Sequence, residues 1–157
     1  MTHLSTFLWF DTQAHEAATF YTSLFHDGRI TGVRHYGEAG PRPAGMVMTV
    51  EFELAGREFI ALNGGPDYTF NESVSIMVHC DTQDEVERLW GRLTDGGEEG
   101  PCGWLKDRYG LSWQVVPKLL FDLLDDPDPI KGQAVMASML AMGKIDSAAL
   151  RTAYESA

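Results

Sequence analysis

The chain has 157 residues, the length of one ordinary domain that can bury a core of its own. Its formal charge is −11, from 23 acidic and 12 basic side chains, so nucleic acid and an anionic membrane surface would repel it. The first residues lack the basic start and apolar core of a signal peptide, and no stretch approaches about 18 consecutive apolar residues. We therefore expect a cytoplasmic protein with no nucleic-acid or membrane partner.

The tripeptide Asp-Thr-Gln occurs twice, beginning at Asp11 and at Asp81, each time between an apolar run and a helix-like segment. Apolar residues then recur at steps of three and four, the period of a helix with one buried face. In each copy Asp or Thr is placed to cap the helix by accepting hydrogen bonds from first-turn amides. The strands keep the offset of 70 residues, whereas the helices are offset by 69, as Ala17 and Val86 show, so the first copy has one extra residue in its turn. The repeat predicts one structural unit written twice.

Three more strands are expected in the first unit. Residues 29–36 form one, and a Gly/Pro-rich loop follows it. Residues 46–54 alternate apolar and polar side chains, the two-residue period of a half-buried strand. The Ala55-Gly56 turn leads into a strand over residues 58–62. The first unit is therefore predicted to be βαβββ.

The second unit begins near Ser73 and repeats this order. Its helix ends at a Gly-Gly pair, since glycine allows the left-handed conformation that closes a last turn. Short strands lie on either side of a Pro-Cys-Gly turn, and a last strand over residues 111–116 ends at Pro117. Residues 118–157 are additional and are predicted to form a helical C-terminal extension, packed over the core or across a dimer contact. Its methionines are interpreted as core filler.

Several motifs resemble one superfamily. A tandem βαβββ arrangement with Phe20-Tyr21 in the first helix and an Asp107-x-x-Gly110 turn before the last strand resembles the vicinal oxygen chelate superfamily, which includes glyoxalases, extradiol dioxygenases and bleomycin-resistance proteins. Four segments look like its PhnB-like branch: Phe-Leu-Trp-Phe-Asp at 7–11, Ala-Leu-Asn-Gly-Gly-Pro at 61–66, Gly-Trp-Leu-Lys-Asp at 103–107 and Ser-Trp-Gln-Val-Val-Pro at 112–117. The resemblance runs through nearly the whole chain, tail included. Members of that branch often carry the label 3-demethylubiquinone-9 3-methyltransferase.

The resemblance implies an α+β architecture, the glyoxalase/bleomycin-resistance fold. In that fold two βαβββ modules form a curved, cup-like sheet around a small-molecule cavity, and homodimers are usual. The modules would occupy about 1–66 and 72–117, within a single domain of residues 1–117 that the extension of 118–157 follows. We expect a small molecule and a second copy of the chain as partners.

The resemblance also implies four ligand positions, which family metal enzymes fill with His, Gln or Glu on the first and last strand of each module. Here these positions fall on Ser5, Asn63, Ser75 and Gln114. The set lacks the imidazole and carboxylate donors that divalent metals need in such sites, so we predict no metal and no metal-dependent isomerase or dioxygenase chemistry. An S-adenosylmethionine site is also unsupported, because the turn after the first strand has no glycine. No cofactor is predicted.

Strand alternation extends these positions into a candidate cavity, since every second side chain points to the same face. The cavity is predicted to be aromatic and apolar with a few neutral hydrogen-bonding groups, as small-ligand pockets usually are. The predicted ligand-binding residues are Ser5, Phe7, Trp9, Asn63, Ser75, Met77, Trp104, Ser112 and Gln114. His79 is the candidate catalytic residue, as the one histidine predicted to lie on a cup-facing strand.

Each of these residues also has a plain structural interpretation. Trp9 either stacks on a planar ligand or packs in the fold, and Trp104 either walls the pocket or covers it. Asn63 either binds ligand oxygen or shapes the Asn-Gly-Gly turn. Gln114 either orients a carbonyl or hydroxyl or is a satisfied interior amide. His79 either acts as a general base or sits beside solvent at a strand end.

Five further residues are assigned structural roles. Asp107 is expected to fix its turn rather than to bind substrate, and Glu51 and Glu53 are expected to face solvent. Cys80 and Cys102 do not form a Cys-x-x-Cys pair and are interpreted as reduced buried thiols, with a redox or nucleophilic role for Cys102 as the alternative.

Three function classes remain open. One is an enzyme acting on a small aromatic or oxygenated substrate, which includes the methyl transfer that the family label implies. The second is a non-catalytic protein that sequesters a small molecule, as bleomycin-resistance proteins do. The third is a mainly structural dimer whose tail contacts another protein. A pocket without strong metal ligands slightly favours the second, because it can bind but has no obvious Lewis acid.

Overall fold

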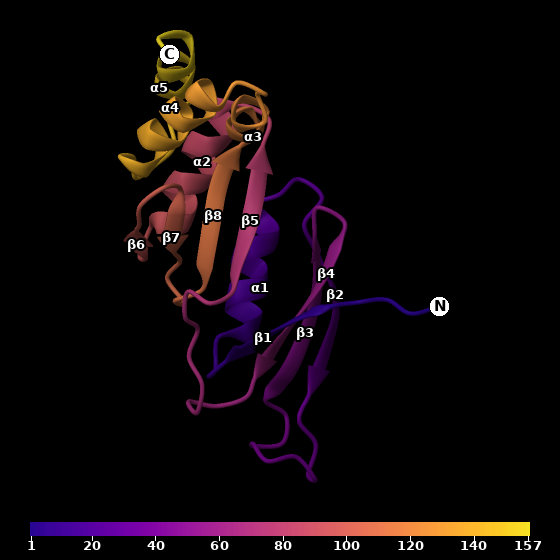
Figure 1. Cartoon of the computed structure of the whole chain (residues 1–157). Coiled ribbons are helices and arrows are strands. Elements are labelled where there is room, and N and C mark those ends of the chain that lie inside the picture. Colours follow the sequence, from indigo (N-terminus) through magenta and orange to yellow (C-terminus); the bar gives the residue numbers. More distant parts are fainter. The chain divides into compact units, whose positions relative to one another are not determined.

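The computed structural model describes residues 1–157, which divide into unit 1, Met1–Phe70, and unit 2, Asn71–Ala157. Each unit contains a four-stranded mixed sheet, which we call sheet A in unit 1 and sheet B in unit 2 (Figure 1). Unit 1 contains β1 (Thr6–Phe10), α1 (Ala14–Ser23), β2 (Arg29–His35), β3 (Val47–Leu54) and β4 (Arg57–Asn63). Its strand order is β1-β4-β3-β2, with β1 parallel to β4 and the other neighbours antiparallel.

Unit 2 repeats this topology with different residues. It contains β5 (Ser75–Cys80), α2 (Gln83–Thr94), β6 (Glu98–Glu99), β7 (Trp104–Lys106) and β8 (Ser112–Pro117). Its strand order is β5-β8-β7-β6, again with one parallel pair, β5 and β8. The prediction of an α+β chain made of two βαβββ modules is confirmed.

The repeated tripeptide lies at the start of both helices, but it does not cap both. Two residues separate β5 from α2, and there Thr82 accepts a hydrogen bond from the Glu85 amide at 3.2 Å. Three residues separate β1 from α1, which confirms the extra residue in the first turn. The residue that precedes α1 is Gln13, whose side chain makes no capping bond, so the predicted Asp or Thr cap of α1 is wrong. The extra residue moves both capping side chains away from the first helical turn.

Replacing Thr82 by alanine is expected to lower the free energy of unfolding by about 1 kcal/mol, because the Glu85 amide loses its capping acceptor. Urea unfolding followed by circular dichroism measures this change. The matched control is Thr12→Ala, in the equivalent tripeptide of unit 1, which should change stability by no more than a few tenths of a kcal/mol. Equal losses in the two variants would contradict the assignment of only one capping threonine.

Each sheet buries one face against its own helix. In unit 1 the buried side of β3 carries Val50, Phe52 and Leu54, and the alternation predicted for this strand is confirmed. Phe52 lies close to Tyr21 of α1 and stacks on Phe59 of β4. In unit 2 the α2 side of the sheet includes the fully buried Trp113 and Val115 with the helix residues Val86, Leu89, Trp90 and Leu93. We call the face of each sheet that points away from α1 or α2 its far face.

The C-terminal extension packs on unit 2. It comprises α3 (Lys118–Leu124), α4 (Pro129–Leu140) and α5 (Ser147–Glu155), which gather beyond the ends of β5 and β8 (Figure 1). A second small core joins it to the sheet and consists of Val116, Leu120, Val135, Ile145 and Leu150. Met139 and Met142 pack against this core, in agreement with the interpretation of the extension's methionines as filler. Met77 of β5, which was predicted to bind ligand, also packs against it. Gln83 of α2 adds two hydrogen bonds, to the Ile145 carbonyl at 2.9 Å and from the Ser147 amide at 3.0 Å.

None of the helices has both the length and the apolar composition needed to cross a membrane.

Candidate functional site

The far face of sheet B gathers the predicted site residues of unit 2. Cross-strand partners share a face of a sheet, and the observed register pairs Ser75 with Ser112 and Met77 with Gln114, while Gln114 also pairs with Trp104. His79 follows on the same face of β5. The face therefore brings together Ser75, Met77, His79, Trp104, Ser112 and Gln114.

Two polar side chains at the centre of this face bind each other. The Nε2 of Gln114 donates a hydrogen bond to Ser75 Oγ at 2.9 Å, and both side chains are half-buried. The amide oxygen of Gln114 has no donor within the protein, so it remains able to accept a hydrogen bond. These are two of the four positions that the resemblance assigned to ligands, and the structure brings them into contact.

Ser112 lies beside this pair with its hydroxyl group unsatisfied. The residue is 1% exposed, and its Oγ has no hydrogen-bond partner. A buried hydroxyl without a partner is unfavourable, because it has lost its bonds to water and gained none. Native proteins contain few buried polar groups without a hydrogen-bond partner, so the unsatisfied hydroxyl of Ser112 requires a structural or functional explanation.

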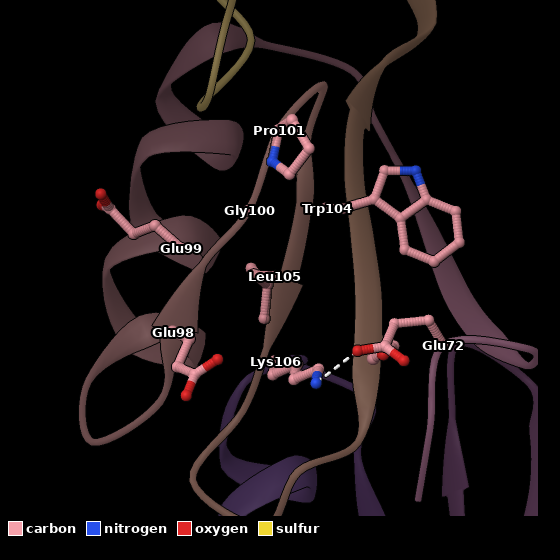
Figure 2. A pocket seen from close by; sticks show the side chains of 9 residues that line it. Glu72, Glu98, Glu99, Gly100, Pro101, Trp104, Leu105 and Lys106 are labelled. Atoms are coloured by element: carbon pink, nitrogen blue, oxygen red, sulfur yellow. Dashed lines mark ion pairs between the residues drawn. The ribbon is translucent and has the colours of Figure 1, made fainter.

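A cavity of about 130 Å³ adjoins the same face at the β6–β7 edge (Figure 2). Its lining includes Trp104, Ser112 and the ion pair between Lys106 and Glu72. The hydrogen bond from Lys106 lowers the pKa of Glu72, and the same contact raises the pKa of Lys106. Trp104 is half-buried and lines this cavity, as the pocket-wall interpretation requires.

His79 lies at the exposed end of the face, beside the extension. Its imidazole ring lies 5.5 Å from the ring of Phe121 in α3, measured between centroids. No hydrogen bond or ion pair to a protein group orients the imidazole, whereas general bases are usually held by a third group. A catalytic role for His79 therefore stays a prediction.

In unit 1, Trp9 and Phe7 lie on the far face of sheet A, opposite Leu62 and Ile60 of β4. Trp9 donates its indole N–H to the Gly65 carbonyl at 2.9 Å and meets Tyr68 edge to face at 4.9 Å. Its ring also lies against Gly64, where an added Cβ would come within 2.4 Å of two ring carbons. Trp9 thus packs the loop that follows β4, and stacking on a ligand stays a prediction.

Asn63 does not share this face. It is 3% exposed and points toward α1, where its Oδ1 accepts a hydrogen bond from the Ala14 amide at 2.8 Å and its Nδ2 donates to the Val47 carbonyl at 3.0 Å. The side chain thus satisfies the first amide of α1, which the displaced tripeptide leaves uncapped. The placement of Asn63 among the ligand positions is corrected: it is a buried structural amide.

The strand register identifies the position that Asn63 was expected to fill. Thr6 pairs with Phe59, so Ser5 adjoins Glu58, to which its Oγ donates a hydrogen bond. Ser75 pairs with Ser112 in the same way, and Gln114 lies two residues further on. The counterpart of Gln114 in β4 is therefore Ile60. Along β4 the residues Phe59, Ala61 and Asn63 are buried and the residues between them are half-buried. This alternation places Asn63 and Ile60 on opposite faces of the sheet.

The far face of sheet A is more charged than the sequence predicted. Glu53 accepts hydrogen bonds from Arg29 at 3.0 and 3.1 Å, and Glu51 is paired with Arg34. Both carboxylates share the face of Trp9, with about a third of each side chain exposed. The expected set of only neutral polar groups is therefore wrong for unit 1.

The donors at these positions do not fit a divalent metal. With the corrected register they are Ser5, Ile60, Ser75 and Gln114, which supply no imidazole and no carboxylate. No group of three or more His, Cys, Asp or Glu side chains lies close enough to hold a metal ion. S-adenosylmethionine fits no better, since both sheets are mixed and the β1–α1 turn has no glycine, whereas doubly wound nucleotide sites use a parallel sheet and a Gly-rich turn.

Asp107 fixes the turn between β7 and β8, as expected. It is 3% exposed, and its carboxylate accepts hydrogen bonds from the amides of Tyr109 at 2.8 Å and Leu111 at 3.1 Å and from the Trp113 indole at 2.9 Å. The side chain points into the core of unit 2, so it belongs to the scaffold of the site.

Cys80 is expected to be inert in the folded protein. Burial, helped by the charge of Glu85, raises the pKa of its thiol to about 11, so at pH 8 roughly one molecule in a thousand carries the reactive thiolate. Titration with Ellman's reagent at pH 8 should modify Cys80 only after unfolding, and the Cys80→Ala variant identifies its signal. Rapid reaction of two thiols in the native protein would contradict this prediction.

Comparison with known proteins identifies the family of the chain and agrees with its fold. A family model described as 3-demethylubiquinone-9 3-methyltransferase matches residues 2–116. The chain belongs to this family, the PhnB-like branch of the vicinal oxygen chelate superfamily. The match ends at residue 116, so the expectation that the resemblance includes the tail is not supported. No protein of curated function matches the chain.

Solved structures extend the comparison. A putative 3-demethylubiquinone-9 3-methyltransferase, PhnB protein, from Bacillus cereus is 34% identical with a TM-score of 0.66, over 74% of this chain and 99% of that one. Protein PA1353 from Pseudomonas aeruginosa is 23% identical with a TM-score of 0.62, over 74% and 98%. A gene product from Arabidopsis thaliana is 18% identical with a TM-score of 0.51, also over 74% and 98%. The last two show the shared fold alone.

Proposed function

We propose that this PhnB-like protein binds a small aromatic or oxygenated molecule on the far face of sheet B. The observation that carries the proposal is the Gln114–Ser75 hydrogen bond, 2.9 Å long, at two of the family's ligand positions. Around it lie the half-buried Trp104 and Met77, which supply apolar contact, and the unsatisfied hydroxyl of Ser112. An apolar surface with a few convergent polar groups is the usual composition of a small-ligand site.

Binding without catalysis is the better-supported form of this function. No protein group orients the His79 imidazole. The four ligand positions supply neither strong metal ligands nor a second acid or base. The alternative is an enzyme acting on the same class of molecule, with His79 as general base. The methyltransferase description of the family adds no support for methyl transfer here, because the residues do not fit S-adenosylmethionine.

The remaining parts of the proposal concern partners and location. The net charge of −11 disfavours nucleic acid and anionic membranes as partners. A homodimer in the cytoplasm without a bound metal completes the proposal. The extension packs against Met77 and Val116 at one end of the far face, so it limits how far a ligand can reach along β5 and β8.

Native mass spectrometry of freshly purified protein tests the proposed site. The wild-type protein should retain a small organic adduct, and Gln114→Leu should lose it because the free amide oxygen is gone. The matched control is Gln133→Leu, on the exposed side of α4, which should keep the adduct. A ligand-free wild type, or equal retention by Gln114→Leu, would overturn the proposal. Observed mass also reports whether the protein is a dimer.

A further inference from the structure

The cavity beside Trp104 has an electrostatic character that the neutral Ser75–Gln114 pair does not share. We infer that it binds a positively charged nitrogen on the ligand, so that the protein prefers small aromatic amines. This inference rests on the proposed function and adds a ligand class to it.

Carboxylates outnumber cations in the cavity lining. Glu72, Glu98 and Glu99 line it together with a single cation, Lys106, which is paired with Glu72 (Figure 2). The carboxylate of Glu99 accepts a hydrogen bond from the Trp90 indole of α2 at 2.9 Å, so it points away from Trp104, and the negative charge near Trp104 comes from Glu72 and Glu98. Glu98 lies opposite Lys106 in the strand register and adds to the rise in the pKa of that lysine. Glu98 itself has no ion pair, so its charge is available to a ligand cation.

The indole of Trp104 supplies a second attraction for the same charge. It lines the cavity from β7, and Figure 2 shows it near the Lys106–Glu72 pair. The face of an indole ring attracts an ammonium group within about 6 Å of its centroid. The Lys106–Glu72 pair joins two exposed side chains and is therefore weak enough for a ligand ammonium to replace the lysine.

The buried hydroxyl of Ser112 distinguishes this cavity from an ordinary acidic surface. The residue lines the cavity, is 1% exposed, and keeps an Oγ that no protein group satisfies. An ammonium group carries several N–H donors, and one of them can give Ser112 Oγ the hydrogen bond that it lacks. The carboxylates would then hold the charge while Ser112 fixes the direction of one N–H bond.

The cavity is half open to solvent, and its size suits a small ring. Its volume of about 130 Å³ is close to the roughly 150 Å³ that accommodates a benzene ring in a protein interior. A single aromatic ring with a short amine chain therefore matches both the volume and the charge.

Three probes with the same ring and chain length test the charge preference: 2-phenylethylammonium, 2-phenylethanol and phenylacetate. Isothermal titration calorimetry at pH 7 should show the ammonium binding at least about tenfold more tightly than the alcohol, and phenylacetate more weakly than both. Glu98→Gln should weaken ammonium binding about tenfold and leave alcohol binding unchanged. The control Glu155→Gln removes the same charge from the exposed surface of α5 and should leave both affinities unchanged.

Ser112→Ala provides an independent readout. It should weaken ammonium binding, yet raise the unfolding midpoint of the ligand-free protein by about 3 °C, because an unsatisfied buried hydroxyl is removed. Equal affinities for the ammonium and the alcohol, or equal losses in Glu98→Gln and Glu155→Gln, would overturn the inferred amine preference and leave the proposed function standing. The absence of saturable binding of 2-phenylethylammonium would also overturn the inferred amine preference. The proposed function is tested separately, by the native mass spectrum.

Discussion

Replacing Asp107 by alanine is expected to lower the free energy of unfolding by about 4 kcal/mol or more. The substitution removes the acceptor for two backbone amides of the turn before β8 and for the Trp113 indole of β8 itself. Hydrogen bonds to a buried charged group contribute roughly 1.5–3 kcal/mol each, and their loss is only partly additive. Since a domain is stable by only about 5–15 kcal/mol, the variant should be close to unfolding at 37 °C. Urea unfolding monitored by tryptophan fluorescence measures the loss.

Two controls separate the turn from a general loss of charge. Asp107→Asn keeps one carbonyl acceptor and should lose less stability than the alanine variant. Asp95→Ala removes an exposed carboxylate that pairs with Arg108 at 3.6 Å and should change stability by less than about 1 kcal/mol. An Asp107→Ala protein with native stability that fails to bind ligand would assign Asp107 to the site instead of to the scaffold.

Replacing Asn63 by leucine is expected to lower the free energy of unfolding by about 3 kcal/mol. The Ala14 amide and the Val47 carbonyl would both lose their partner, and each buried polar group without a partner costs about 1–3 kcal/mol. Thermal unfolding by circular dichroism, together with urea titration, measures the change. Ligand binding by the fraction that remains folded should be unaltered, because Asn63 points toward α1.

The other asparagine of the chain serves as the control. Asn71 is exposed, and its side chain bonds only to the neighbouring Ser73, so Asn71→Leu should cost less than about 1 kcal/mol. Asn63→Asp should fall between the two, since an aspartate can still accept from Ala14 at the helix N-terminus but cannot donate to Val47. If Asn63→Leu kept full stability and lost ligand, the original placement of Asn63 in the site would be restored.

The fold was predictable because periodicity and the repeat agree. Steps of three and four mark both helices, alternation marks β3, and the offsets of 70 and 69 located the extra residue between β1 and α1. The same rule of alternation placed Ser75, Met77 and His79 on one face of β5. In unit 2 the residues that share the candidate face could therefore be derived from the sequence.

Unit 1 shows where this reasoning failed. The family pattern places a ligand position near Asn63 on the last strand of the first module, but alternation along β4 assigns Asn63 to the α1 side with Phe59 and Ala61. The role of Asn63 depends on the extra residue before α1, which leaves the Ala14 amide without a capping side chain. The sequence shows the extra residue and the asparagine, but it does not show that the end of β4 meets the start of α1.

The exact pairing of neighbouring strands also could not be predicted from the sequence. The register between β2 and β3 shifts at two irregularities, between Ile30 and Gly32 and between Arg34 and His35. The partners of Glu51 and Glu53 depend on those shifts, so the charged far face of sheet A could not be predicted. The unsatisfied hydroxyl of Ser112 likewise becomes visible only when every neighbour has been placed.

We propose that this PhnB-like protein binds its ligand through hydrogen-bonding and apolar groups, without a metal at the family's ligand positions. Native mass spectrometry with elemental analysis, on protein purified in parallel with EDTA and with added zinc and manganese, tests it directly. We expect the same organic adduct in all preparations and no stoichiometric metal in any of them. One tightly bound divalent metal per chain, or an adduct that disappears with EDTA, would contradict it.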